Sequence, residues 1–173
     1  MEPTLFTIPD FLRPAECAAM IALAEGRGFE PAPITTATGF AMRPDIRNNT
    51  RVMLDDVALA ERLWARIAPA HGAHPGAVGL NERFRFYRYT RRQAIRWHHD
   101  GAFRRDAREA SRLTLMIYLN EGFGGGGTEF DEAETVVPSA GMALVFAHHL
   151  RHQGAPVAHG TKYVLRTDVM FRG

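Results

Sequence analysis

The chain has 173 residues, of which 46% are hydrophobic, and a formal net charge of +2 at neutral pH. This length allows one sizeable hydrophobic core and is too short for two full domains, so we expect a single domain over residues 1–173. Its single cysteine, Cys17, excludes an internal disulfide, and neither a signal peptide nor the roughly 18 apolar residues of a membrane span can be found, so we expect a cytoplasmic protein without a membrane partner.

Residues 1–79 are predicted to form a support of helices and strands. Apolar side chains recur at helical spacing in residues 14–27, where a proline opens the helix and glycines follow it. A second helix is predicted over residues 57–67 from its apolar stripe. The polar stretch 47–51 is interpreted as a surface turn, the alternative being a strand that borders a substrate opening. Residues 71–79 are rich in glycine and indicate a loop, which we take as the internal boundary.

Beyond residue 80 the pattern changes to short strands with alternating side chains, separated by turns. Four glycines at 124–127 indicate one of these turns. At least six strands without intervening helices are typical of a double-stranded β-helix, or jelly roll. The predicted fold class is therefore mainly β with flanking helices (α+β), with a β-helix core over residues 80–173. The strands are expected around residues 84–89, 113–120, 135–137, 142–146 and 162–170.

The pair His98 and Asp100 is a candidate metal site. Alternation along a strand directs both side chains to one face, whereas His99 points away. Two imidazoles and one carboxylate on one face of a metal leave the opposite face open, which is the arrangement used by non-haem iron(II) oxygenases. A third ligand could come from one of four later histidines, and His152 has the most suitable context because it follows a predicted strand. The four are His148, His149, His152 and His159.

Lys162 is the only lysine in a chain that uses arginine everywhere else. It opens the last apolar strand, where a buried ammonium group requires an anionic partner such as the distal carboxylate of 2-oxoglutarate. Alternation from Lys162 directs Val164, Arg166 and Asp168 to the same inward face. We therefore hypothesise that Arg166 binds an anionic group of the substrate or of 2-oxoglutarate, with a structural pair between Arg166 and Asp168 as the alternative.

Residues 82–171 resemble a known family in the order and spacing of several motifs. These are residues 89–97 leading into His98-His99-Asp100-Gly101, the run 113–120, Gly126-Gly127-Thr128-Glu129-Phe130, Pro138 with Gly141, His152-Gln153-Gly154, and Gly160-Thr161-Lys162-Tyr163. Taken together they are similar to the prolyl 4-hydroxylase-like branch of the 2-oxoglutarate and Fe(II)-dependent dioxygenases.

The resemblance implies a role for individual residues. His98, Asp100 and His152 match the catalytic iron ligands, and Lys162 and Tyr118 match the residues that hold the distal carboxylate of 2-oxoglutarate. Tyr89 matches a tyrosine that lines the co-substrate pocket. The implied cofactors are Fe(II), 2-oxoglutarate and dioxygen, with ascorbate as a further candidate. The implied reaction decarboxylates 2-oxoglutarate to succinate and hydroxylates a substrate.

Two departures from the family pattern leave the substrate open. Peptidyl-prolyl members usually have glycine where this chain has Arg92, and tryptophan where it has Asp168. The candidates are therefore a peptidyl residue, a free amino acid or a small metabolite. A nucleic acid substrate would draw on the ten arginines of residues 83–112, but the longer arginine pattern of the demethylase branch is missing, and we expect no such partner. Alternative functions are a cupin-like metal dioxygenase or isomerase without 2-oxoglutarate, and a non-catalytic metal-dependent sensor.

Overall fold

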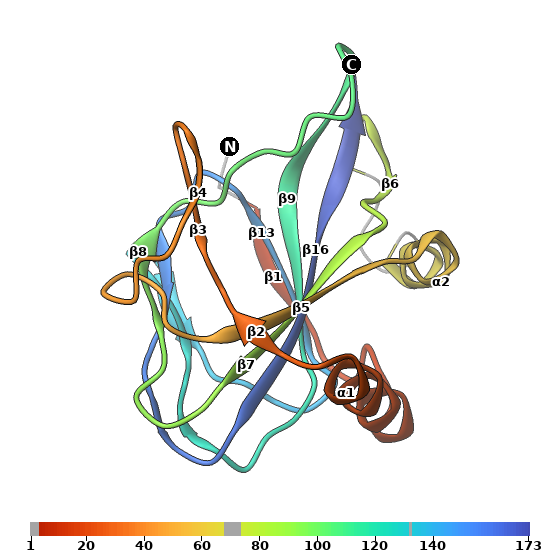
Figure 1. The fold of residues 1–173 in the computed structure, drawn as a ribbon. Helices are drawn as coiled ribbons and strands as arrows, with labels where there is room; N and C mark the ends of the chain where they lie inside the picture. The colour runs from red at the N-terminus through yellow and green to blue at the C-terminus, as the bar shows by residue number, and fades with distance from the viewer. Residues whose placement is uncertain (1–3, 68–73, 132) are drawn as a thin grey trace.

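Two β-sheets face one another, and two helices cover the outer side of the larger sheet (Figure 1). The structure is a computed structural model that describes residues 4–67, 74–131 and 133–173. All of the strand pairs are antiparallel. No helix in the described residues is long and apolar enough to cross a bilayer.

The larger sheet has eight strands, and its long central strands β9 and β16 are paired over most of their length. The order is β1 (Leu5–Ile8), β13 (Ala143–Ala147), β9 (Glu109–Tyr118), β16 (Lys162–Arg172), β7 (Arg83–Tyr89), β5 (Thr50–Asp55) and β2 (Glu30–Pro31), with β6 (Ala77–Leu80) paired to the far part of β16.

The smaller sheet has four strands, and two short two-stranded ladders flank the assembly. Its order is β12 (Ala133–Val136), β11 (Thr128–Phe130), β14 (His152–Gly154) and β8 (Ile95–His98). The flanking ladders are β10 (Gly124–Gly125) with β15 (Val157–His159), and β3 (Ile34–Thr36) with β4 (Gly39–Ala41).

Both helices begin where the sequence supplies a cap, and α1 also ends at one. α1 (Pro14–Arg27) has proline at its first position, and the Arg13 amide donates to the Glu16 carboxylate at 2.8 Å. Gly28 ends it with a φ of 85°, a conformation that glycine adopts without steric cost. α2 (Val57–Ile67) is capped by Asp56, whose Oδ1 accepts from the Leu59 amide at 2.8 Å.

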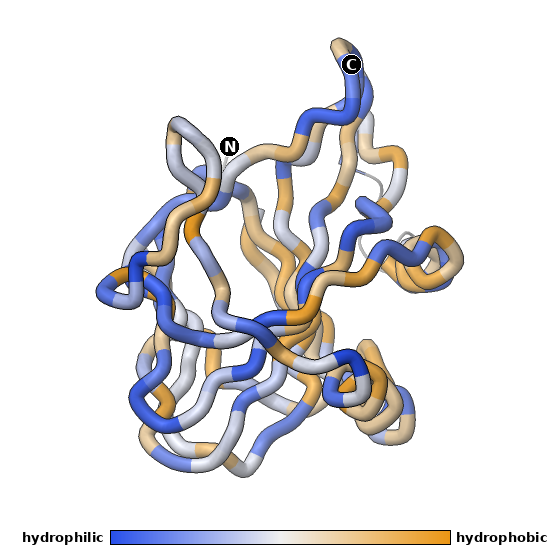
Figure 2. Tube along the Cα trace, in the orientation of Figure 1, coloured by the Kyte–Doolittle hydropathy of each residue, from blue (hydrophilic) through white to orange (hydrophobic). Residues whose placement is uncertain are grey.

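Alternation along the strands separates two cores. Side chains of β7, β9, β13 and β16 that point outward pack with the helices, and among them Phe84, Leu115 and Leu165 are at most 1% exposed. Side chains that point inward form a second cluster between the sheets, with Tyr118 and Phe146 at its centre. Figure 2 shows the apolar stretches of the helices and the neighbouring strands gathered on that side of the molecule.

The inward face of the larger sheet and the smaller sheet enclose a cavity of about 460 Å³. Lys162, Val164, Arg166 and Asp168 all line it, which confirms the alternation predicted for the last strand. The cavity also extends to the β3–β4 hairpin, through residues such as Ile34 and Phe40.

Most of the predicted elements are confirmed, including both helices at their predicted bounds. Residues 71–73 of the predicted loop 71–79 lie outside the described residues, and the loop prediction is wrong at its other end, where Ala77 begins β6. The interpretation of 47–51 as a surface turn is wrong: Arg47 and Asn49 are buried, and Thr50 begins β5. A polar stretch can be buried when it lines a cavity instead of a hydrophobic core, and sequence polarity does not distinguish that case from a surface turn.

Candidate metal centre

Strand register brings the two candidate histidines together. His98 ends β8 and His152 begins β14, and in the β8–β14 ladder these two residues lie directly opposite one another. Their ring centroids are 4.3 Å apart. Asp100 follows two residues after His98, just beyond the strand end. Two neighbouring strands of the smaller sheet supply both histidines, and the segment that follows β8 supplies the carboxylate.

His98, Asp100 and His152 form a compact group of potential ligand atoms. One ligand atom from each lies within 4.8 Å of the other two, and no other such group of His, Cys, Asp or Glu occurs within residues 4–67, 74–131 and 133–173. His98 Nε2 lies 3.5 Å from Asp100 Oδ1, and His152 Nε2 lies 3.9 Å from Asp100 Oδ2. The Nε2 atoms of both rings and the carboxylate therefore converge on one point.

Backbone carbonyls orient both imidazoles. His98 Nδ1 lies 2.7 Å from the Arg96 carbonyl, and His152 Nδ1 lies 2.9 Å from the Leu150 carbonyl. A carbonyl only accepts hydrogen bonds, so each Nδ1 carries the proton and each Nε2 offers its lone pair. Hydrogen bonds of this kind fix the ring orientation of metal-binding histidines.

The charges of the group suit a divalent cation. Burial lowers the pKa of His152 to about 4, so its imidazole is neutral at neutral pH. Burial raises the pKa of Asp100, but the Arg166 guanidinium and the hydrogen bond from Thr114 act against it, and that pKa is held well below its usual range. Two neutral nitrogen donors and one carboxylate are the ligand set of the facial triad that binds Fe(II), so the residues present fit this metal.

The other four histidines considered near the candidate ligands lie elsewhere. His99, His149 and His159 are exposed. His148 is buried, but its Nε2 faces Asp168 at 3.6 Å. The structure therefore brings His152, among the four later histidines, to His98 and Asp100.

Lys162 occupies another wall of the same cavity. It is 3% exposed, and its Nζ donates to the Gly126 carbonyl at 2.6 Å. Its Nζ lies 4.9 Å from the ring centroid of Tyr89 and 5.6 Å from that of Tyr118. No carboxylate pairs with it among the described residues, and burial lowers its pKa to about 7.

Tyr118 and Tyr89 lie beside Lys162. The Tyr118 hydroxyl and Thr128 Oγ1 are hydrogen-bonded at 2.5 Å. Tyr89 lies opposite Lys162 in the β7–β16 ladder. The cluster offers an ammonium group and two hydroxyl groups inside an apolar wall, which suits one end of a small dicarboxylate.

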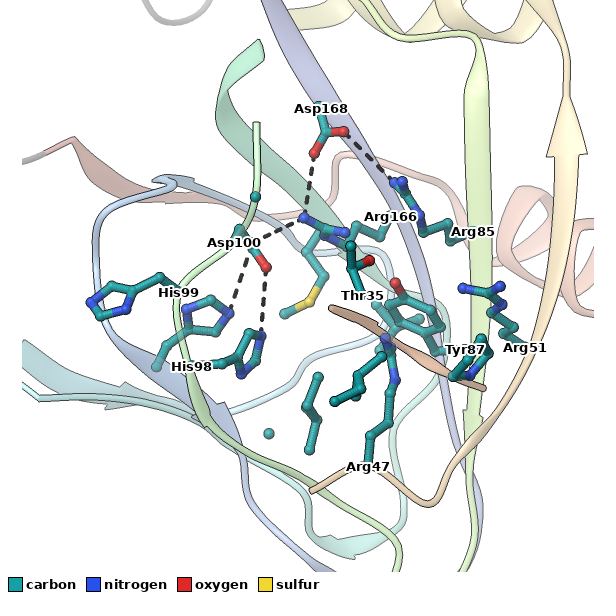
Figure 3. A pocket seen from close by; sticks show the side chains of 18 of the residues that line it. Thr35, Arg47, Arg51, Arg85, Tyr87, His98, His99, Asp100, Arg166 and Asp168 are labelled. Atoms are coloured by element: carbon teal, nitrogen blue, oxygen red, sulfur yellow. Dashed lines mark hydrogen bonds and ion pairs between the residues drawn. The ribbon is translucent and has the colours of Figure 1, made fainter. Parts of the chain in front are cut away.

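Arg166 lies beside the candidate metal ligands instead of beside Lys162. Its Nη2 is 3.0 Å from Asp100 Oδ2 and 3.4 Å from Asp168 Oδ1. The pair with Asp168 that the sequence suggested as the alternative is therefore present, and Asp100 is a second partner. Figure 3 shows the guanidinium group between the two carboxylates.

Arg85 and Tyr87 of the cavity escaped the sequence analysis, which included Arg47 and Arg51 only in the alternative interpretation of residues 47–51. All four line the cavity, and Figure 3 shows them across it from His98 and His99. The alternation in residues 84–89 could have indicated two of them, because Arg85, Tyr87 and Tyr89 share one face of that strand.

A jelly roll that carries two histidines and a carboxylate between its sheets defines the class of non-haem iron oxygenases. Residues 84–167 match the family model of the 2OG-Fe(II) oxygenase superfamily. This match includes every candidate metal ligand, and over these residues the chain is similar to that superfamily, whose oxygenases depend on Fe(II) and 2-oxoglutarate.

Solved structures confirm the fold. The chain is similar to a viral collagen prolyl hydroxylase of Paramecium bursaria Chlorella virus-1, with 22% identity, 96% of each chain covered and a TM-score of 0.69. It is also similar to a prolyl-4-hydroxylase of Pseudomonas putida, with 23% identity, coverage of 99% of this chain and 94% of that one, and a TM-score of 0.72. A Trichoplax adhaerens prolyl hydroxylase, solved with a hypoxia inducible factor peptide, gives 16% identity, coverage of 97% and 83%, and a TM-score of 0.74. A search of curated proteins found no match.

Proposed function

We propose that this dioxygenase holds Fe(II) with His98, Asp100 and His152, and binds the distal carboxylate of 2-oxoglutarate with Lys162 and Tyr118. The observation that carries the proposal is that the three ligand atoms, within 4.8 Å of one another, share one cavity with a buried lysine that has no carboxylate partner among the described residues. A buried ammonium group without an anion is costly, and a dianionic co-substrate supplies that anion.

The chain's residues would bind, orient and exclude water. The carbonyls of Arg96 and Leu150 keep both Nε2 atoms directed at the metal position. Lys162 and Tyr118 fix one end of 2-oxoglutarate so that its 2-oxo acid end reaches the metal. The apolar side chains of Met116, Phe146 and Val164 line the same cavity and keep water out of it.

Fe(II), when bound, activates dioxygen at the open face of the three ligands. The overall reaction balances as follows: 2-oxoglutarate, dioxygen and a substrate C–H group give succinate, carbon dioxide and a substrate C–OH group. The substrate would be a peptidyl residue, a free amino acid or a small metabolite. The surface arginines do not require a nucleic acid partner, because Arg83, Arg88 and Arg105 pair with Asp55, Glu25 and Glu82 respectively.

The test is co-substrate binding followed by turnover. We expect the protein with Mn(II) to bind 2-oxoglutarate in calorimetry, the Lys162→Met variant to lose about 100-fold in affinity, and the Fe(II) protein to release succinate. The matched control is His99→Ala, which changes an exposed histidine next to the candidate ligands. Metal binding without any affinity for 2-oxoglutarate would favour the cupin-like alternative instead.

A further inference from the structure

Strand register gathers arginines around Tyr87 on the inward face of the larger sheet. Arg51 of β5 lies opposite Tyr87, and Arg166 of β16 lies opposite Arg85. Arg47 precedes β5 and places its guanidinium carbon 4.3 Å from the centroid of the Tyr87 ring. All of these side chains line the cavity that contains the candidate metal ligands (Figure 3).

Arg166 is the member of this group whose charge is well matched, because two carboxylates lie within 3.4 Å of it. Arg47 is 9% exposed, and its Nε donates to the neutral Asn49 Oδ1 at 2.8 Å. Arg51 makes neither an ion pair nor a side-chain hydrogen bond within the described parts of the chain.

Arg85 reaches a carboxylate that is already shared. Its Nη1 lies 3.7 Å from Asp168 Oδ2, and the same Nη1 is buried without a hydrogen-bond partner among the described residues. Asp168 also faces Arg166 and His148. The Asp168 carboxylate is therefore shared among Arg85, Arg166 and His148.

The cavity as a whole has an excess of positive charge. Six cationic side chains line it, Arg47, Arg51, Arg83, Arg85, Lys162 and Arg166, against the two carboxylates Asp100 and Asp168. Arg83 is paired with Asp55 outside this group. Fe(II) carries two positive charges and 2-oxoglutarate two negative charges, so binding both leaves the excess of positive charge in the cavity unchanged.

We propose that Arg47, Arg51 and Arg85 form a subsite for an anionic group, a carboxylate or a phosphate, of the primary substrate. Guanidinium groups bind these anions through paired, charge-assisted hydrogen bonds. Figure 3 shows Arg47, Arg51 and Arg85 across the cavity from His98, and Arg166, whose charge is matched by two carboxylates, is not part of the subsite. This inference rests on the proposed function, because it assigns the remaining part of the same cavity to the substrate.

The positive potential around Tyr87 supports the subsite. Burial raises the pKa of its hydroxyl, but Arg47, Arg166 and Arg85 outweigh burial and lower that pKa to about 8. A site that stabilises a tyrosinate also stabilises a carboxylate or a phosphate in the same place. The charges of Arg47 and Arg85 repel that of Arg51, so an anion bound among them relieves this repulsion.

The experiment compares ligands that differ in one charge. Protein saturated with Mn(II) and 2-oxoglutarate is titrated by calorimetry with N-acetylproline, which has a free carboxylate, and with its neutral amide, N-acetylprolinamide. Inorganic phosphate is the second anionic probe. We expect the acid to bind at least about tenfold more tightly than the amide, and phosphate to compete with the acid.

Variants show which side chains are responsible. Arg51→Gln and Arg85→Gln should each reduce the preference for the acid to within about twofold. The matched control is Arg88→Gln, because Arg88 lies on the same strand as Arg85 but pairs with Glu25 outside the cavity. It should leave the preference unchanged, and circular dichroism checks that each variant is folded.

The outcomes separate the two proposals. Equal binding of acid and amide by protein that binds 2-oxoglutarate overturns the subsite and leaves the proposed function standing. If Arg85→Gln loses 2-oxoglutarate while Lys162→Met retains it, the arginines hold the co-substrate and the subsite is also overturned. If 2-oxoglutarate does not bind, the proposed function fails, and phosphate titration of the same protein and of Arg85→Gln still decides the subsite.

Discussion

The guanidinium group of Arg166 lies 3.0 Å from Oδ2 of Asp100, the candidate carboxylate ligand of the metal. Thr114 Oγ1 donates to the same oxygen at 2.5 Å. Oδ2 is thereby held by protein groups, and Oδ1 is left facing Nε2 of His98. The positively charged Arg166 therefore orients Asp100, the carboxylate that would bind the metal ion.

This relationship predicts that Arg166→Gln makes stability depend on metal. Asp100 and Asp168 lose their common counter-charge, and breaking a buried pair of this kind costs about 3 kcal/mol. A bound divalent ion supplies part of the missing charge. We expect a lower melting temperature for the metal-free variant than for the wild type, and a larger rise on adding Mn(II), measured by thermal unfolding.

Arg88→Gln is the control, because its pair with Glu25 is partly exposed and contributes little. Its melting temperature should respond to Mn(II) as the wild type does. Equal metal-induced rises in Arg166→Gln and the wild type would contradict the compensation between Arg166 and the metal.

The pKa of Lys162 predicts how 2-oxoglutarate binding depends on pH. Burial lowers that pKa to about 7, and a bound carboxylate raises it, so binding takes up a proton above pH 7. Affinity at saturating Mn(II) should fall by about tenfold per pH unit between about pH 7 and 9. Calorimetry in two buffers of different ionisation enthalpy measures both the affinity and the proton uptake.

Lys162→Arg is the matched control, since a guanidinium group stays protonated throughout this range. Any 2-oxoglutarate affinity that this variant keeps should not change with pH. A wild-type affinity that does not change with pH would refute the role of the lysine.

Lys162→Met should raise the melting temperature of the metal-free protein at neutral pH by about 5 °C, because it removes a buried ammonium group.

Metal affinity should depend on His152 and not on its neighbours in the sequence. His152→Ala removes one of three converging ligand atoms and should weaken Mn(II) binding by at least about 100-fold. His149→Ala changes an exposed side chain and should have no effect. Electron paramagnetic resonance of Mn(II) titrations measures both, and comparable losses in the two variants would contradict the assignment of the ligands.

The candidate ligands were predictable because their geometry is local. His98 and Asp100 are two residues apart, and both lie at the end of one strand although β8 itself ends at His98. The choice of His152 among four histidines rested on its place after a predicted strand and on the resemblance, because the register that sets it opposite His98 is a contact between distant segments. Periodicity along one strand carries no information about which residue of another strand it meets.

The arginines around Tyr87 show the limit of that reasoning. Arg51, Arg85 and Arg166 come from three strands. Alternation from Lys162 placed Arg166 on the inward face, but nothing in the sequence set Arg51 and Arg85 beside it. Their proximity depends on the pairing of β5, β7 and β16. Of the ten arginines in residues 83–112, Arg83 and Arg85 line the cavity. The concentration of arginines in one part of the sequence therefore did not predict where the cationic site lies.

Tyr87 provides a spectroscopic measure of this cationic site. Its pKa is lowered to about 8, whereas the pKa of Tyr89 is raised to about 12 and those of Tyr118 and Tyr163 are also raised. A tyrosinate absorbance titration of the metal-free protein should therefore show the ionisation of one tyrosine near pH 8, separate from the others. Tyr87→Phe should remove this phase.

The arginines, not the fold in general, are expected to set this pKa. Arg85→Gln should move the phase toward the ordinary value of 10, while Arg88→Gln leaves it in place. Because the pKa is depressed in the folded state, ionised Tyr87 stabilises the fold fully above about pH 10, and this contribution is lost as the pH falls through about 8. An anion bound at the arginine subsite should also raise the pKa, since it cancels the charge that lowers it. If all four tyrosines ionise together above pH 10, then the potential at Tyr87 is not positive, and the reason for expecting an anion there disappears.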